Sequence, residues 1–380
     1  MNQKLCSGWK RAAKLLQIAV AGLTVFAAAS SQAQGNPTYI GLGPAKAMYY
    51  KPDSGPAPRV AFLIVHRTSN YLQHPGCQEL PKRGFAALCM NTRFDNNEFL
   101  VDWDLIALDV KAGMEYLRKQ AGIEKVVLFG HSGGGPTLSY YQAVAENGTA
   151  FCKSPQKLVP CRDELANLPK GDALVLADAH PGVPVILLRS LNGSVVNETP
   201  KSFDPALDPY NPANGYNPSG ASAYTADFQA RYYAAQSKRM NALIESALAK
   251  RRALQAGSGP YPDNDIFLIP HGGNPGAGPG GASQLHSLDP KDKLRFTKLP
   301  RKLLKNDGSI SEQMVVSVSP VELQTKDSTN AFDRGTKLLS IRSFLSTQAV
   351  MSNNSLDGID HCSSNNSTVC ACLLYTSPSP

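Results

Sequence analysis

The stretch KVVLFGHSGGGPT, residues 125–137, decides the fold of this chain. Lys125 to Phe129 form a short apolar run rich in β-branched residues, which is typical of a strand buried on both faces. The glycine-flanked Ser132 follows, and a helix is predicted from about Gly133 to Asn147. A strand that passes through glycines straight into a helix must turn sharply, so we predict that the Ser132 hydroxyl is exposed at a tight bend.

Three further apolar runs flank this stretch, at 60–65, 85–90 and 173–177. A helix that Asp102 can cap and that Gly122 stops lies between the second run and residues 125–137. Strands that alternate with helices predict an α/β fold with a mostly parallel central sheet and helices on both faces. We expect this core to span residues 34–199.

The alternation stops near residue 200. A segment rich in Pro, Asn, Tyr and Ser comes first, then a long helix from about Asp227 to Ala256, and then a Gly-rich stretch at 271–282. Short strands and an amphipathic helix around Ile341 to Val350 complete the region. We interpret residues 200–345 as a cap or lid inserted over the sheet; a separate second domain is the alternative that stays open.

The segment from Gly130 to Gly134 matches the pattern Gly-x-Ser-x-Gly, and its place between a strand and a helix is the context that this pattern requires. A phosphate-binding loop would need other glycine spacings, which are absent. Over roughly residues 38–190 the chain resembles the α/β-hydrolase superfamily. The resemblance implies an α/β-hydrolase fold, Ser132 as nucleophile and the Gly133 amide as one donor to the oxyanion.

A second oxyanion donor should follow an earlier strand, where Val65-His66-Arg67-Thr68 stands in place of the His-Gly frequent in the family. We assign it to the amide of Thr68 or of Arg67. The Arg67 side chain either contacts an anionic substrate group or is a solvated surface arginine. We expect His66, His131 and His180 to line the pocket.

In this superfamily the acid follows the nucleophile and the histidine comes last. Asp178, just after the fourth apolar run, is the candidate acid, with local backbone capping as the alternative reading. His361 is the best candidate base; His271 and His286 fit solvated surface positions. After His361 only 19 residues remain. The missing strand, helix and last strand need about 50.

We therefore expect a C-terminally truncated chain. In this reading residues 346–371 return toward the core but leave it incomplete, and residues 372–380 form a non-native tail. A natural Ser/Pro-rich tail is the alternative. A truncated sheet would expose an edge and lower the stability of the fold.

The first 33 residues have the layout of a secretory signal peptide: a basic start, an apolar stretch and small residues at the cleavage positions. A membrane anchor is the alternative, although the apolar run is short for a span. Removing the four positive charges of this segment lowers the net charge from +8 to +4, and the remaining basic residues are dispersed. We expect no nucleic-acid partner and no membrane span after processing, and a periplasmic or secreted location.

Export permits disulfides. Cys152 and Cys161 flank a short polar loop and are the best pair, whereas Cys77 with Cys89 is less favoured because Cys89 lies in a predicted buried strand. No cysteine spacing has the histidines of a zinc site, so no metal is implied.

Together these features predict an exported serine hydrolase that cleaves carboxylic esters without a metal or organic cofactor. The Tyr and Pro residues of the predicted cap suggest a small ester with an apolar or aromatic group. Two alternatives stay open: a catalytically inactive binding protein on the same fold, and a truncated, non-functional fragment. Hydrolase chemistries with Asp at the elbow are disfavoured by Ser132.

Overall fold

A computed structural model of the chain describes residues 36–198, 202–216, 223–270, 299–305, 307–313, 337–353 and 358–371. The expected signal peptide, the residues His271 and His286, and the expected tail at 372–380 lie outside these ranges. None of the helices within them is long and apolar enough to cross a bilayer.

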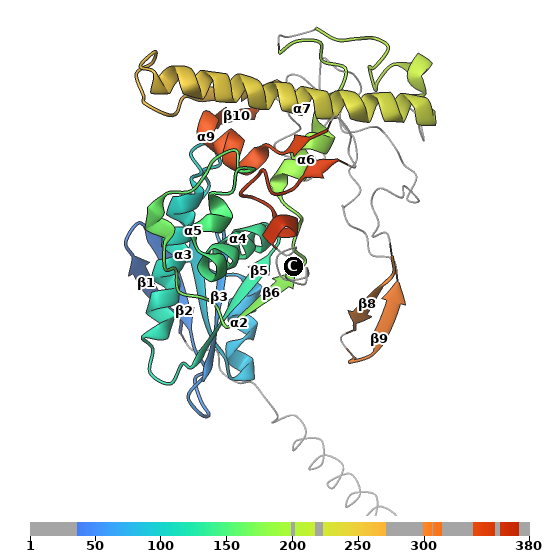
Figure 1. The fold of residues 1–380 in the computed structure, drawn as a ribbon. Coiled ribbons are helices and arrows are strands. Elements are labelled where there is room, and N and C mark those ends of the chain that lie inside the picture. Colours follow the sequence, from blue (N-terminus) through green and yellow to red (C-terminus); the bar gives the residue numbers. More distant parts are fainter. Residues whose placement is uncertain are drawn as a thin grey trace, which may run out of the picture.

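A six-stranded sheet forms the centre of the N-terminal half (Figure 1). Its strands in chain order are β1 (Thr38–Leu42), β2 (Ala45–Tyr50), β3 (Val60–His66), β4 (Ala86–Asn91), β5 (Lys125–His131) and β6 (Ala173–Ala177). Their order across the sheet is β1-β2-β4-β3-β5-β6. The four strands from β4 to β6 run parallel, and β1 and β2 add an antiparallel edge. The predicted mostly parallel sheet is confirmed.

Helices cover both faces of this sheet, as predicted. Helices α3 (Trp103–Arg118) and α4 (Gly134–Asn147) pack on one face. There Leu63, Val65 and Leu88 join the main apolar core. The short helix α2 (Pro75–Glu79) covers the other face, where Ile64, Ala87 and Cys89 pack against Cys77. Alternate residues of one strand thus enter two different cores, which explains the unbroken apolar runs.

A second apolar cluster forms beyond the sheet. It joins α6 (Val183–Ser190), the 30-residue α7 (Ala226–Gln255), the antiparallel pair β7 (Ile266–Ile269) and β10 (Lys337–Ser340), α9 (Ile341–Ser343) and the π-helix η5 (Phe344–Gln348). Leu187, Leu243 and Phe344 are among its buried residues. Figure 1 shows α7 lying across α6 and α9 at the end of the molecule. The boundaries 200–345 stay a prediction, and α6, from the expected core range, joins this cluster.

The remaining elements are short. They are the helices α5 (Thr149–Cys152), η1 (Pro81–Arg83), η2 (Asp163–Leu165) and η3 (Pro212–Asn214), the hairpin β8 (Arg301–Leu304) and β9 (Ile310–Gln313), and the pair β11 (Met351–Ser352) and β12 (Ile359–Asp360). Among the described residues β6 pairs only with β5, so it forms an edge of the sheet. Val175 and Leu176 on this edge are 38% and 39% exposed.

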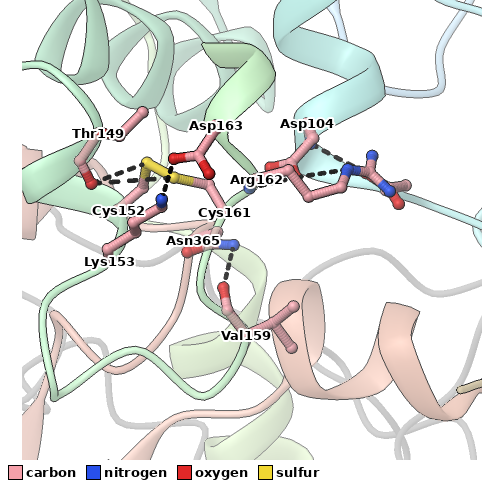
Figure 2. Close-up of a disulfide and its surroundings, with 10 residues drawn as sticks. Asp104, Thr149, Cys152, Lys153, Val159, Cys161, Arg162, Asp163 and Asn365 are labelled. Carbon is pink, nitrogen blue, oxygen red and sulfur yellow. Dashed lines mark hydrogen bonds and ion pairs between the residues drawn. A yellow bond between two sulfur atoms is a disulfide. The ribbon is translucent and has the colours of Figure 1, made fainter. Parts of the chain in front are cut away.

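Three disulfides occur within the described residues. Cys152–Cys161 is the pair favoured from the sequence, and Figure 2 shows it closing the loop whose Val159 carbonyl accepts a hydrogen bond from the Asn365 side chain. The judgement against Cys77–Cys89 is wrong. Cys89 points out of β4 toward the face that α2 covers, so a buried strand position is compatible with the bond. Cys362–Cys370 is the third pair.

Candidate active site

The predicted tight bend is present between β5 and α4. Ser132 has φ +50°, in the left-handed region that residues with a Cβ rarely adopt. The backbones meet closely here, because a methyl group on Gly134 would lie 2.4 Å from the carbonyl oxygen of Val65. A glycine is therefore required two residues after the serine. Such a held, strained conformation at a strand-to-helix turn is typical of a functional site.

Helix α4 begins at Gly134 with Gly133 as its N-terminal cap. The first amides of a helix have no partner within the helix, and the helix dipole is positive at this end. Ser132 directly precedes these amides in the chain, and its hydroxyl makes no hydrogen bond with another described residue. The geometry therefore leaves a hydroxyl next to backbone donors that suit a developing negative charge.

His66 ends β3, the strand next to β5. Its Nδ1 accepts hydrogen bonds from the amides of Thr68 at 3.1 Å and Ser69 at 2.8 Å, so its proton is on Nε2. The Thr68 amide, a predicted oxyanion donor, is thus engaged with His66. Burial, followed by the neighbouring charges of Arg67, His180 and His131, lowers the pKa of His66 to about 3. His66 is therefore a neutral donor through Nε2.

Arg67 is 5% exposed, so the solvated reading of this residue is wrong. Its Nε and Nη2 pair with the carboxylate of Glu98, and the Thr68 hydroxyl donates to the same carboxylate at 2.8 Å. Burial alone would raise the pKa of Glu98, but Arg67 and these hydrogen bonds outweigh it and lower the pKa. The third nitrogen, Nη1 of Arg67, is buried without a hydrogen-bond partner.

A histidine pair lies on the other side of the bend. His74 Nδ1 accepts from the Gly76 amide, so its Nε2 donates to Nδ1 of His131 at 3.2 Å. The Tyr71 hydroxyl lies 3.0 Å from the same Nδ1 and donates to the His131 carbonyl at 3.1 Å. These contacts fix the residue before Ser132. Tyr71 and His74 were missed from the sequence, although both follow the carboxyl end of β3, where site residues of a parallel sheet gather.

Asp178 and His180 follow β6, directly beside the bend. Asp178 is exposed, with φ +46°. Nδ1 of His180 accepts from the Gly182 amide at 3.1 Å, and burial, followed by the charge of Arg67, lowers the pKa of His180 to about 4. His66, His131 and His180 therefore do lie around Ser132, although their roles stay predictions.

His361 lies in the segment after β12. Its Nδ1 is buried without a hydrogen-bond partner, and its electrostatic neighbours are Asp360 and Arg189. Burial is the main cause of its lowered pKa. No hydrogen bond among the described residues joins Ser132, Asp178 and His361, so the structure assembles no triad from them. The same segment does contact the loop after β6 through Thr368, whose hydroxyl donates to the His180 carbonyl at 3.0 Å.

A polar cavity of about 690 Å³ adjoins the Arg67–Glu98 pair. Its lining residues are Thr68, Ser69, Asn70, Asp95, Asn96 and Glu98. A more apolar cavity of about 600 Å³ lies between the 99–100 segment and residues 261–266. Ser132 is in the lining of neither cavity, so the expected apolar or aromatic substrate stays a prediction. Within the described residues, no group of three His, Cys, Asp or Glu could hold a metal ion.

The sheet order, the helices on both faces and the serine at the strand-to-helix bend define an α/β-hydrolase fold. No protein-family model and no curated protein matches the chain.

Similar solved structures include three esterases. Est1E from Butyrivibrio proteoclasticus is 19% identical, with 30% of this chain and 47% of that chain covered and a TM-score of 0.25. A bacterial heroin esterase is 16% identical, with 44% and 52% covered and a TM-score of 0.31. Esterase B from Lactobacillus rhamnosis is 17% identical, with 47% and 60% covered and a TM-score of 0.30. The chain thus spans about half the length of the first two. Because every one of these TM-scores is below 0.5, the functional proposal rests on the residues of the site.

Proposed function

We propose that this protein is a serine hydrolase that cleaves small carboxylic esters through an acyl-enzyme on Ser132. The observation that carries the proposal is the left-handed Ser132, held between β5 and α4 beside the helix amides. A buried or merely structural serine would have no reason to keep a strained backbone at this position.

In the proposed reaction, Oγ of Ser132 bonds to the ester carbonyl carbon, and the π electron pair moves to the carbonyl oxygen. The hydroxyl proton passes to a general base and then to the departing alcohol. Water completes the cycle by hydrolysing the acyl-enzyme. The Gly133 amide stabilises the oxyanion. His361 stays the candidate base named from the sequence; the Nδ1 contacts of His66 and His180 leave their protons on Nε2, which makes them donors here.

The polar cavity beside the Arg67–Glu98 pair supports a substrate with hydroxyl or amide groups next to the ester. The three disulfides support the proposed export to the periplasm or beyond, because such bonds persist in oxidising compartments.

Labelling with a fluorophosphonate tests the nucleophile. We expect the wild-type chain to be labelled on the tryptic peptide that contains Ser132, and Ser132→Ala to lose the label. Ser139→Ala, inside α4, is the matched control and should keep it. A folded wild-type protein that takes no label would instead favour the inactive binding protein.

A further inference from the structure

The three nitrogens of the Arg67 guanidinium lie in two different environments. Nε and Nη2 face the Glu98 carboxylate, whereas Nη1 points away from that pair and is buried without a partner. Buried donors without a partner are rare in folded proteins, and each one requires a reason. An arginine remains charged at every pH that proteins tolerate, so this unmet donor belongs to a full positive charge.

The position of Nη1 is defined by Gly133. A methyl group on Gly133 would lie 3.0 Å from Nη1 of Arg67 and 2.3 Å from Nε2 of His66. Both nitrogens therefore pack directly on the backbone of the residue that follows the proposed nucleophile. Because Nδ1 of His66 accepts two amides, its Nε2 carries a proton there. One cationic and one neutral N–H donor thus converge on Gly133, whose amide is the proposed oxyanion donor.

The Thr68 amide, one of the two predicted backbone donors, is already engaged. The amides of Thr68 and Ser69 both donate to His66. The same strand end places the buried charge of Arg67 next to these amides.

We propose that Arg67 stabilises the negative charge that forms on the substrate oxygen at the Gly133 amide, and that Glu98 holds the guanidinium in the orientation that this requires. The inference rests on the proposed reaction of Ser132. The charge acts across Gly133 through a region closed to water, where electrostatic interactions are stronger than in solvent. It acts only once the oxyanion exists, so it should affect the chemical step rather than substrate binding.

Two single variants and their combination test this. Arg67→Gln removes the charge, Glu98→Gln removes the counter-charge, and the double variant replaces the ion pair by two amides that can still hydrogen bond. For each, kcat and KM are measured on an ester that the wild-type protein turns over. The affinity for phenylboronic acid is measured as well. In that adduct Oγ of Ser132 bonds to boron, its proton leaves to solvent, and the tetrahedral boron becomes an anion like the oxyanion.

We expect Arg67→Gln to lower kcat about 100-fold, the size of effect seen when one oxyanion donor is removed. KM should change little, and phenylboronate affinity should fall with kcat. Glu98→Gln keeps a side-chain oxygen that can accept from the guanidinium, so the orientation is retained. It should strengthen phenylboronate binding, because the Arg67 charge is then uncompensated. The double variant removes both members of the ion pair, although Lys337 then faces an amide in place of the Glu98 carboxylate. It should fold, yet its kcat and boronate affinity should stay as low as in Arg67→Gln.

Recovery of kcat in the double variant would overturn the inference, because it would mean that the pair serves only to keep the loop in place. An increase in KM with kcat unchanged would also contradict it and would make Arg67 a substrate-binding group. The proposed function has its own failure: phenylboronate would then bind the wild type no better than Ser132→Ala does.

Discussion

Ser132 and Asp178 stand side by side at the ends of two paired strands. The residues before them, His131 and Ala177, face each other in the register of β5 and β6. Ser132 and Asp178 themselves both have left-handed backbones, with φ +50° and +46° respectively. Asp tolerates this conformation better than most residues, but Ser does not. The strain at the carboxyl edge of the sheet is therefore concentrated on the proposed nucleophile.

This strain predicts that Ser132→Gly stabilises the protein. Relief of a left-handed non-glycine residue should raise the free energy of unfolding by about 1 kcal/mol, while esterase activity is lost with the hydroxyl. Denaturant unfolding of the purified variant measures the change. Ser132→Ala keeps the strain and should leave stability unchanged.

Ser139 offers a control within the helix that follows. Because Ser139 lies inside α4, Ser139→Gly should destabilise the protein, by about 0.5–1 kcal/mol. If Ser132→Gly also destabilises, the bend is not strained.

The close approach at Gly134 predicts a severe effect of one methyl group. In Gly134→Ala the new carbon would meet the Val65 carbonyl oxygen, and neither backbone can retreat without moving a central strand. We expect a loss of about 1–3 kcal/mol in the free energy of unfolding, the range for overpacking, and weaker fluorophosphonate labelling. Gly41→Ala is the matched control, since nothing lies within 4 Å of its added methyl. Equal stability of the two variants would contradict the close packing of Gly134 against Val65 at the bend.

The buried histidines predict acid sensitivity. The folded pKa values of His66 and His180 are about 3 and 4, below the ordinary value of 6.5. Between these values and pH 6.5 the unfolded chain binds more protons, so stability rises with pH there. The contribution is complete above about pH 6.5 and is lost as the pH falls, with a slope of at most about 1.4 kcal/mol per pH unit for each histidine.

Unfolding free energies between about pH 5.5 and 6.5 check this slope, because ordinary carboxylates are almost fully ionised there. His66→Asn, whose side-chain oxygen can still accept an amide hydrogen bond, should flatten the dependence. The same slope in His66→Asn and wild type would show that His66 is not the group responsible.

The Cys77–Cys89 bond predicts a redox dependence of stability. The two residues are 12 apart in sequence, and both are fully buried. Closing a loop of this size contributes about 3 kcal/mol in the chain-entropy model. The double variant Cys77→Ala, Cys89→Ala should be less stable than the wild type by about that amount. The difference in stability between wild type and variant should become smaller under reducing conditions. If reductant leaves this difference unchanged, the loss of stability comes from packing and not from the disulfide.

The sheet was predictable because its strands are buried on both faces. Each apolar run, such as 60–65, is a local pattern that needs no knowledge of its neighbours. The long helix was equally local: the predicted limits Asp227 and Ala256 differ by one residue each from α7. The second apolar cluster was not predictable in this way, because it joins α6 to segments more than 50 residues further along the chain.

The residues of the site also differ in how far they could be predicted from local sequence. Ser132 was found through its glycines, whose spacing is a local consequence of the bend. The burial of Arg67 could not be predicted, because its partner Glu98 is 31 residues away. No pattern in the residues next to Arg67 indicates this pairing. The Cys77–Cys89 bond was misjudged for a related reason. A strand pattern shows that a residue is buried, but not which element packs over it.

One side of β6 pairs with no described strand, and this has a consequence for handling the protein. A strand at the edge of a sheet presents a row of free amides and carbonyls, and here Val175 and Leu176 add exposed apolar surface to that row. Natural edges are usually protected by charge, proline or a bulge; the sequence ALVLA of β6 has none of these. We therefore expect this chain to aggregate through the β6 edge, so that its solutions become turbid as the concentration rises despite the net positive charge. The substitution Val175→Lys should prevent this aggregation.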